Sequence, residues 1–217
     1  RGSRLRLFQG IAKMHRFMLH FHPWETDLET INIRSLQFEL PDRPAVKPVV
    51  YQEAGVFEDI FGQRKLNWVE RALINMADSR VKAYGILAWG DAPDFGYTEQ
   101  GRGGGLMVWA NNEYDFPHAA MLLYARTAER RFLDYMLVTA QHLMDVDVCH
   151  YSDNPLRFQG QVTHSAHHVT GKVSPCHEWV EGLLDFYHIT GDRRALETAL
   201  GIGNNIVRLL AQPRYQG

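Results

Sequence analysis

The chain has 217 residues and a formal net charge of −2 at pH 7, the length of one ordinary domain or of one domain with part of another. No basic patch stands out to neutralise a phosphate backbone, so nucleic acid is not expected as a partner. Charged residues interrupt every apolar stretch well before the roughly 20 residues that a membrane span needs. The sequence therefore predicts a soluble protein without membrane partners, and secretion or cytoplasmic residence stays open.

The two ends of the sequence and its two cysteines say little about function. The sequence begins at Arg1 without Met or an apolar leader, and it stops just after a helical pattern, which suggests a fragment of a longer protein. Cys149 and Cys176 are interpreted as buried free thiols, because two cysteines alone do not define a pairing.

The alternation of apolar and polar residues with a period of two predicts β-strands over residues 5–40. The apolar members are Leu5, Leu7, Phe17, Leu19, Phe21, Ile31 and Ile33. Pro41, Pro44 and Pro48 then indicate a linker, since each removes a backbone donor and restricts its neighbour. Residues 1–50 are therefore interpreted as the C-terminal part of a β-rich domain and a linker. His15, His20 and His22 fit a solvated sheet face better than a metal site.

From residue 51 to residue 217 the chain is interpreted as a second, helical domain. Apolar residues recur at spacings of three and four from Leu66 to Ala77, which predicts an amphipathic helix over roughly 57–80. The glycine-rich stretch from Gly90 to Gly105 has neither a GxGxxG frame nor a Walker lysine. A turn-rich loop is expected there rather than a ligand cradle.

An internal repeat organises the C-terminal half. Residues 127–133 (TAERRFL) align with residues 190–196 (TGDRRAL), an offset of 63. In each copy a helix ends, a turn follows, and a second amphipathic helix returns, over 132–144 and 195–210. Helix hairpins repeated at a long period must stack on neighbours to bury their apolar faces. The fold class is therefore mainly α, a fragment of an (α/α) toroid of helix hairpins preceded by the end of a β-rich domain.

The same offset aligns the starts of the two first helices. Asp115 corresponds to Glu178 and His118 to Glu181, while Pro117 and Pro175 lie near the expected first turns. First helices are thus expected to start near 115 and 178, at the same end of the helical layer.

Between Trp109 and Trp179 the chain concentrates polar and ionisable side chains. The window from His150 to His177 holds five histidines, more than a helical scaffold needs, because imidazole titrates near neutrality and suits a core poorly. We interpret the segment as an active site. If it is one, His150, His177 and at least one of His164, His167 and His168 should face a common cleft.

The chain resembles the exo-rhamnogalacturonan lyase-like (PcRGLX/YetA-like) family over about residues 85–200. The resemblance rests on the runs 111–118 (NNEYDFPH), 145–151 (DVDVCHY), 164–170 (HSAHHVT) and 174–182 (SPCHEWVEG). It implies a β domain, a catalytic (α/α) toroid and a further β domain. It also implies cleavage of the rhamnose–galacturonate backbone of pectin by β-elimination.

Elimination at a uronate needs a group that neutralises the carboxylate, a base for the C5 proton and an acid for the departing O4. On chemical grounds the candidate catalytic residues are His150, Tyr151, His168 and His177. Arg157 and Asn112 are the candidates for the substrate carboxylate. The remaining candidates for binding an acidic polysaccharide or oligosaccharide are Trp109, Glu113, Tyr114, His164, Glu178 and Trp179. No cofactor or metal is expected, with a divalent cation such as calcium as the alternative.

Three other interpretations stay open. A glycoside hydrolase on the same toroid would use paired carboxylic acids, drawn from Glu113, Asp115 or Glu178 and an acid in the range 145–153. A metal site could be built from His150, His164, His167 and His168, although their spacing matches no strong ligand pattern. The third alternative is a non-catalytic helical repeat that binds carbohydrate or protein.

Overall fold

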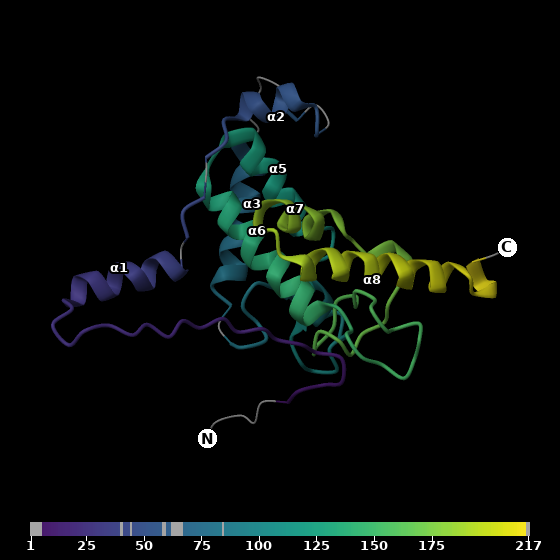
Figure 1. Ribbon diagram of the computed structural model, residues 1–217. Coiled ribbons are helices and arrows are strands. Elements are labelled where there is room, and N and C mark those ends of the chain that lie inside the picture. Colours follow the sequence, from purple (N-terminus) through teal and green to yellow (C-terminus); the bar gives the residue numbers. More distant parts are fainter. Residues whose placement is uncertain are drawn as a thin grey trace.

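The computed structural model describes residues 6–39, 41–43, 45–57, 60–61, 67–83 and 85–215. The chain is mainly helical, as expected from the sequence (Figure 1). Its α-helices are α1 (Leu28–Glu39), α2 (Pro48–Ala54), α3 (Asn67–Val81), α4 (Phe95–Glu99), α5 (Phe116–Thr127), α6 (Arg130–His142), α7 (Glu181–Thr190) and α8 (Arg193–Leu210). A π-helical turn, η1 (Leu143–Asp147), extends α6, and short 3-10 turns form η2 (Pro175–His177) and η3 (Pro213–Tyr215). None of the described helices is long and apolar enough to cross a bilayer.

The prediction of strands over residues 5–40 is wrong for the described part of that range. Residues 28–39 form α1, and no strand is assigned among residues 6–27. The carboxylate of Asp27 accepts hydrogen bonds from the Thr30 amide and hydroxyl, each at 2.8 Å, and so caps the first turn of the helix. No residue of α1 is buried, and the helix lies apart from the bundle in Figure 1. The β-rich domain that these strands were to close stays a prediction.

The expected linker and the expected long helix need smaller corrections. Pro48 begins helix α2 instead of continuing a linker, which suits a first-turn position where its missing amide costs nothing. Helix α3 covers the C-terminal part of the predicted helix over 57–80, whereas residues 58–59 and 62–66 lie outside the described residues. Pro44 also lies outside them.

The glycine-rich stretch is turn-rich, as expected, with two short ordered elements inside it. Strand β1 (Pro93–Asp94) pairs antiparallel with β2 (Val108–Trp109), so that Pro93 lies opposite Trp109. Asp94 accepts a hydrogen bond from the Tyr97 amide at 2.9 Å and caps α4. The loop thereby fixes Tyr97 close to the segment that carries the expected site.

The repeat forms two helix hairpins, α5–α6 and α7–α8, as predicted. Thr127 and Thr190 make the same pair of hydrogen bonds. Each hydroxyl donates to the carbonyl four residues earlier, at 2.7 and 2.6 Å, and accepts the amide two residues later, at 3.1 Å in both copies. The repeated threonine therefore ends the first helix and turns the chain into the second.

The two first helices begin at the same end of the helical layer, as the repeat predicts. Asp115 caps α5, and its carboxylate also accepts the Gly182 amide in the first turn of α7, at 3.2 and 3.1 Å. A Cβ on Gly182 would lie 2.5 Å from Asp115 Oδ1, so only glycine permits this approach. Helix α7 starts at Glu181 rather than near 178, because Pro175 opens the separate turn η2.

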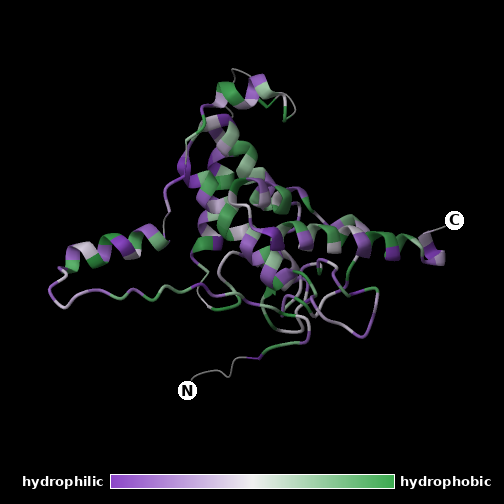
Figure 2. Ribbon diagram, in the orientation of Figure 1, coloured by the Kyte–Doolittle hydropathy of each residue, from purple (hydrophilic) through white to green (hydrophobic). Residues whose placement is uncertain are grey.

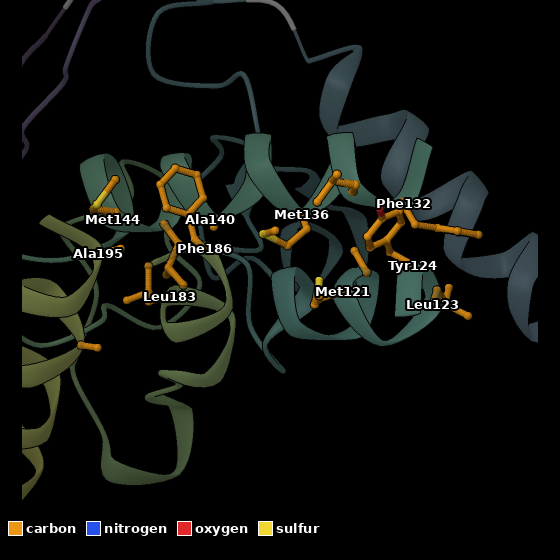
Figure 3. Packing of buried hydrophobic residues seen from close by; sticks show 14 of the residues in the cluster. Met121, Leu123, Tyr124, Phe132, Met136, Ala140, Met144, Leu183, Phe186 and Ala195 are labelled. Carbon is orange, nitrogen blue, oxygen red and sulfur yellow. The ribbon is translucent and has the colours of Figure 1, made fainter. Parts of the chain in front are cut away.

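Apolar faces of the two hairpins meet in one core. Met121, Met136 and Leu183 are among its buried members, and Phe132 and Tyr124 close one end of the row shown in Figure 3. Figure 2 shows apolar and polar residues alternating along α8, the pattern of a helix with one face on a core. Hydrophobic burial between the hairpins therefore holds the polar loops in place.

A reciprocal pair of substitutions tests the repeat. Ala128 and Gly191 occupy equivalent left-handed positions, with φ of 57° and 73°. A Cβ on Gly191 would meet nothing within 4 Å. The effect of exchanging alanine and glycine at these positions therefore comes from the backbone conformation alone. We expect Ala128→Gly to raise, and Gly191→Ala to lower, the free energy of unfolding by roughly 0.5–1 kcal/mol. Urea unfolding measures both, and changes of equal sign would contradict the equivalence.

Candidate functional site

The loop before α5 is held in a conformation that L-residues rarely adopt. Asn111, Asn112, Tyr114 and Asp115 all have positive φ, between 47° and 61°. Such backbone persists only where its surroundings hold it, and it clusters at functional sites. Asn111 Nδ2 donates to the carbonyls of Val162 and His168, at 2.8 and 2.9 Å. The loop thus places Glu113 and Tyr114 on one side and a buried polar network on the other.

Glu113 brings together two of the predicted histidines. Its Oε1 accepts hydrogen bonds from His164 Nδ1 at 3.0 Å and from the His164 amide at 3.3 Å. The Nδ1 of His177 lies 2.9 Å from the same oxygen but is not oriented to form a hydrogen bond with it. Two imidazoles therefore converge on one carboxylate, with the His177 side chain a quarter exposed.

The hydrogen-bond partners of His164 indicate its tautomer. Its Nδ1 faces a carboxylate, which can only accept, whereas its Nε2 lies 2.8 Å from Arg102 Nη1, which can only donate. These partners fit the tautomer of His164 that carries its proton on Nδ1. Tyr97 stacks on this ring at 3.7 Å between centroids, and the Arg102 guanidinium lies 4.0 Å above the Tyr97 ring. Tyr97 and Arg102 thus complete a cluster that also holds Glu113, His164 and His177, here called the Glu113 cluster.

Aromatic surface lies next to the Glu113 cluster. The rings of Tyr114 and Trp179 are 6.1 Å apart, and Tyr114 is 70% exposed. Both residues adjoin members of the cluster in sequence, Tyr114 after Glu113 and Trp179 two residues after His177. Exposed aromatic faces beside a charged group are typical of sites that stack on sugar rings. Trp109 was predicted for the same role, but its ring packs on His168, with centroids 5.4 Å apart.

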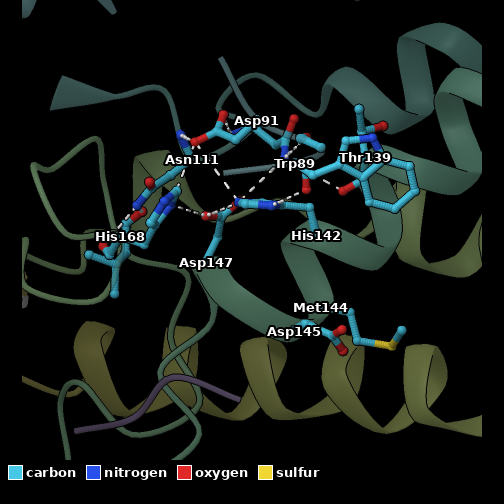
Figure 4. A network of polar contacts seen from close by, with 12 residues as sticks. Trp89, Asp91, Asn111, Thr139, His142, Met144, Asp145, Asp147 and His168 are labelled. Atoms are coloured by element: carbon cyan, nitrogen blue, oxygen red, sulfur yellow. Dashed lines mark hydrogen bonds and ion pairs between the residues drawn. The ribbon is translucent and has the colours of Figure 1, made fainter. Parts of the chain in front are cut away.

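A second, fully buried network lies behind this loop (Figure 4). Asp147 Oδ1 is 3.1 Å from both His142 Nε2 and His168 Nδ1. Asp91 Oδ2 is 3.6 Å from His168 Nδ1 and 4.0 Å from His142 Nε2. In an α-helix, residues five apart point about 140° away from each other. The π-helical turn η1 changes that register and brings His142 and Asp147 together.

Opposite charges shift the pKa values in this buried network. Burial and the Asp147 charge raise the pKa of Asp91. Burial would also raise that of Asp147, but the facing His142 and His168 lower its pKa to about 2. Burial opposes protonation of His142, yet Asp147 and Asp91 outweigh it and raise the pKa of the imidazole. Asp147 is therefore charged at neutral pH.

The structure separates other predicted residues from the Glu113 cluster. His150 Nε2 contacts the Met144 carbonyl at 2.7 Å and lines a different cavity with Lys13 and Arg194. Tyr151 is 59% exposed, and its hydroxyl donates to Asp153 at 3.2 Å. The structure does not bring His150 to the cleft expected with His177, because the contacts and the cavity of His150 include neither His177 nor Glu113.

Arg157 and Asn112, the predicted carboxylate-binding residues, are occupied inside the fold. Arg157 donates to the Val169 carbonyl. Asn112 is fully buried and donates to Asp147 Oδ2 at 3.3 Å, while its Oδ1 accepts from Arg80 at 3.2 Å. Arg102 is the guanidinium that stands at the candidate site. As for the thiols, Cys149 is buried as expected, but Cys176 is exposed.

The carboxylate of Glu178 holds a backbone amide in place, and its buried environment raises its pKa. Its Oε1 accepts the Gln161 amide at 3.0 Å, and burial raises its pKa to about 8 against the opposing effects of that bond and of Arg208. Asp115 behaves alike: burial, and a hydrogen bond shared with Glu181, raise its pKa to about 7.

These two shifts predict how stability depends on pH. The folded protein keeps protons on Glu178 and Asp115 that the unfolded chain, with carboxyl pKa values near 4, has released. Stability should therefore fall as pH rises from about 5 to about 8. Thermal melting across that range measures it, with Glu178→Gln expected to reduce the slope. A melting temperature that rises over the range would contradict the assignment.

Sequence reasoning missed Tyr97, Arg102, Asp91 and His142. Asp94 is a residue type that often caps helices, so its position could have indicated the start of α4 and thereby the place of Tyr97. His142 lay inside a helical pattern, where one histidine in a stripe signals nothing by itself.

Comparison with known proteins finds no matching family model, no matching curated protein and no matching solved structure. The function is therefore a proposal, drawn from the family resemblance of the sequence and from the geometry of the described residues.

Proposed function

We propose that the chain is part of a polysaccharide lyase that acts by β-elimination on uronic-acid-containing pectic polysaccharide of the rhamnogalacturonan type, on an (α/α) toroid. The observation that carries the proposal is the convergence of His164 and His177 on Glu113, at 3.0 and 2.9 Å. Beside it stand a guanidinium, Arg102, and exposed aromatic surface at Tyr114. Cation, imidazole and phenol are the groups that elimination at a uronate needs.

Each group has a role in the proposed step. Arg102 pairs with the substrate carboxylate, which makes the C5 proton more acidic. His177 removes that proton, and Glu113 stabilises the imidazolium that forms, as a carboxylate does behind a catalytic histidine. The electrons of the C5–H bond form the C4=C5 double bond while the C4–O4 bond breaks. One of the two phenols, Tyr97 or Tyr114, donates a proton to the departing O4.

The movement of Arg102 connects binding to chemistry. In the free protein Arg102 donates to His164 Nε2 at 2.8 Å. A substrate carboxylate offers Arg102 a stronger, charge-assisted partner. Binding then leaves the lone pair of His164 Nε2 available to accept a substrate hydroxyl.

Hydrolysis by paired carboxylates is the second candidate, and Asp115 is the observation that favours it. A pKa of about 7 suits a general acid, and Glu181 is its carboxyl partner. However, Asp115 is 5% exposed and accepts amides from both His118 and Gly182. Its contacts are those of a helix cap that joins the two hairpins, so elimination is preferred.

Product analysis on a panel of pectic and uronic-acid polysaccharides distinguishes the two reactions. Elimination leaves a C4=C5 bond conjugated to the carboxylate, so the products absorb in the ultraviolet, whereas hydrolysis leaves none. We expect absorbance to rise with galacturonate-containing backbones. Release of reducing sugar without an increase in ultraviolet absorbance would contradict the lyase proposal and support a hydrolase.

A further inference from the structure

We propose that Asp91, His142, Asp147 and His168 bind one divalent transition-metal ion of the zinc class, a site that the proposed elimination does not require. Each of the four side chains offers a ligand atom, and these atoms all lie within 4.8 Å of one another. All four residues are buried. Two imidazoles and two carboxylates form a ligand set of the type that zinc takes in proteins.

The distances fit an ion at the centre. Zinc bonds to nitrogen and oxygen of about 2.0–2.1 Å in a tetrahedron place neighbouring ligand atoms roughly 3.3 Å apart. The separations here are 3.1 Å from Asp147 Oδ1 to each imidazole, and 3.6 and 4.0 Å from Asp91 Oδ2 to His168 and His142. These four separations lie within about 0.7 Å of the tetrahedral value, and the ligand atoms of all four residues lie within 4.8 Å of one another.

The orientation of His142 is that of a metal ligand. Its Nδ1 lies 2.8 Å from the Trp89 carbonyl, which can only accept, so Nδ1 carries a proton. The other ring nitrogen, Nε2, faces the two carboxylates and is the atom that would bind the ion. Metal-bound histidines usually donate their other ring N–H to a carbonyl or carboxylate in this way.

The carboxylates are held from outside by donors, as ligating carboxylates are. Asp91 accepts the amides of Asn111 at 2.9 Å and Asn112 at 3.3 Å. Asp147 Oδ2 accepts Asn112 Nδ2 at 3.3 Å, which leaves Oδ1 directed at the two imidazoles. The strained backbone at 111 and 112 thus serves to aim Asp91. A divalent ion would add positive charge beside these buried carboxylates, whose burial is costly without compensation.

An ion could reach the cluster from one side and would act on the fold. His168 and Trp109 line a cavity of about 240 Å³ together with Phe8 and His167, which gives an access route. Four protein ligands with no open position are typical of a structural site. Through Asn112 the ion would fix the loop that carries Glu113.

Metal binding by the whole chain tests the proposal without any substrate. We expect native mass spectrometry to find one zinc ion per chain, and removal of the metal by a chelator to lower the melting temperature. The cobalt-loaded protein should show the visible absorption of a four-coordinate Co²⁺ site. A chain that takes up no zinc and leaves Co²⁺ with its aqueous spectrum would show a histidine–aspartate ion-pair network instead.

A pair of neighbouring substitutions localises the ion. Asp147→Asn keeps the shape of the side chain but removes its charge, and it should weaken zinc binding by about a hundredfold or more. Asp145→Asn is the matched control, because Asp145 lies in the same turn η1 and points away from the network (Figure 4). It should bind zinc as the unsubstituted chain does. Equal affinity in both variants would overturn the site, and if Asp147→Asn fails to fold, the cobalt spectrum still decides.

Discussion

Replacement of His177 by alanine should lower the rate of elimination by about a hundredfold or more, the usual scale for losing one positioned acid or base. The imidazole stands 2.9 Å from Glu113 and is partly exposed, so it can meet a substrate while the carboxylate stabilises its charged form. The measurement is the initial rate of ultraviolet absorbance on the best substrate of the panel. The melting temperature should change little, because a quarter of the His177 side chain faces solvent.

Two further variants separate the Glu113 cluster from the other predicted residues. Glu113→Gln should also reduce turnover strongly, since a neutral amide no longer stabilises an imidazolium. Tyr151→Phe is the control, because its hydroxyl contacts Asp153 and no member of the Glu113 cluster. A full rate in His177→Ala together with a large loss in Tyr151→Phe would move the chemistry to the 150–151 segment.

Asn111→Ala should lower the free energy of unfolding by about 2–4 kcal/mol, the sum of lost buried hydrogen bonds and backbone strain. The side chain is fully buried and donates to Val162 at 2.8 Å and to His168 at 2.9 Å. Its φ of 52° is tolerated by asparagine better than by alanine. Urea unfolding gives the value.

The control for Asn111 is Asn204→Ala, an exposed position in α8, where alanine favours the helix. That variant should match or exceed the unsubstituted protein in stability. A loss below about 1 kcal/mol in Asn111→Ala would mean that the loop before α5 is not held by these bonds.

Helix hairpins could be predicted because their signal is local and repeated. Thr127 and Thr190 recur with the same neighbours, and the structure gives them the same hydrogen bonds. The N-terminal strands failed because a period of two over three or four residues is weak evidence. The Asp27 cap, which starts α1, is a local hydrogen-bonding signal that a period of two does not contain.

The sequence indicated which ionisable residues belong to the candidate site, but not which of them contact one another. Glu113, His164 and His177 stood out as ionisable residues in one segment, and they converge. Arg102 could not be assigned, because only the fold of the glycine-rich loop brings it to His164. His142 and Asp147 meet through a π-helical turn, and an expected α-helix would have pointed them apart.

Imidazole signals of the histidines, followed by nitrogen-15 NMR during titration with a galacturonate-containing oligosaccharide, test the central claim most directly. The Glu113 cluster predicts that the signals of His164 and His177 move with ligand, while those of His150 and His188 stay in place. Movement of His150 without His164 and His177 would contradict the account.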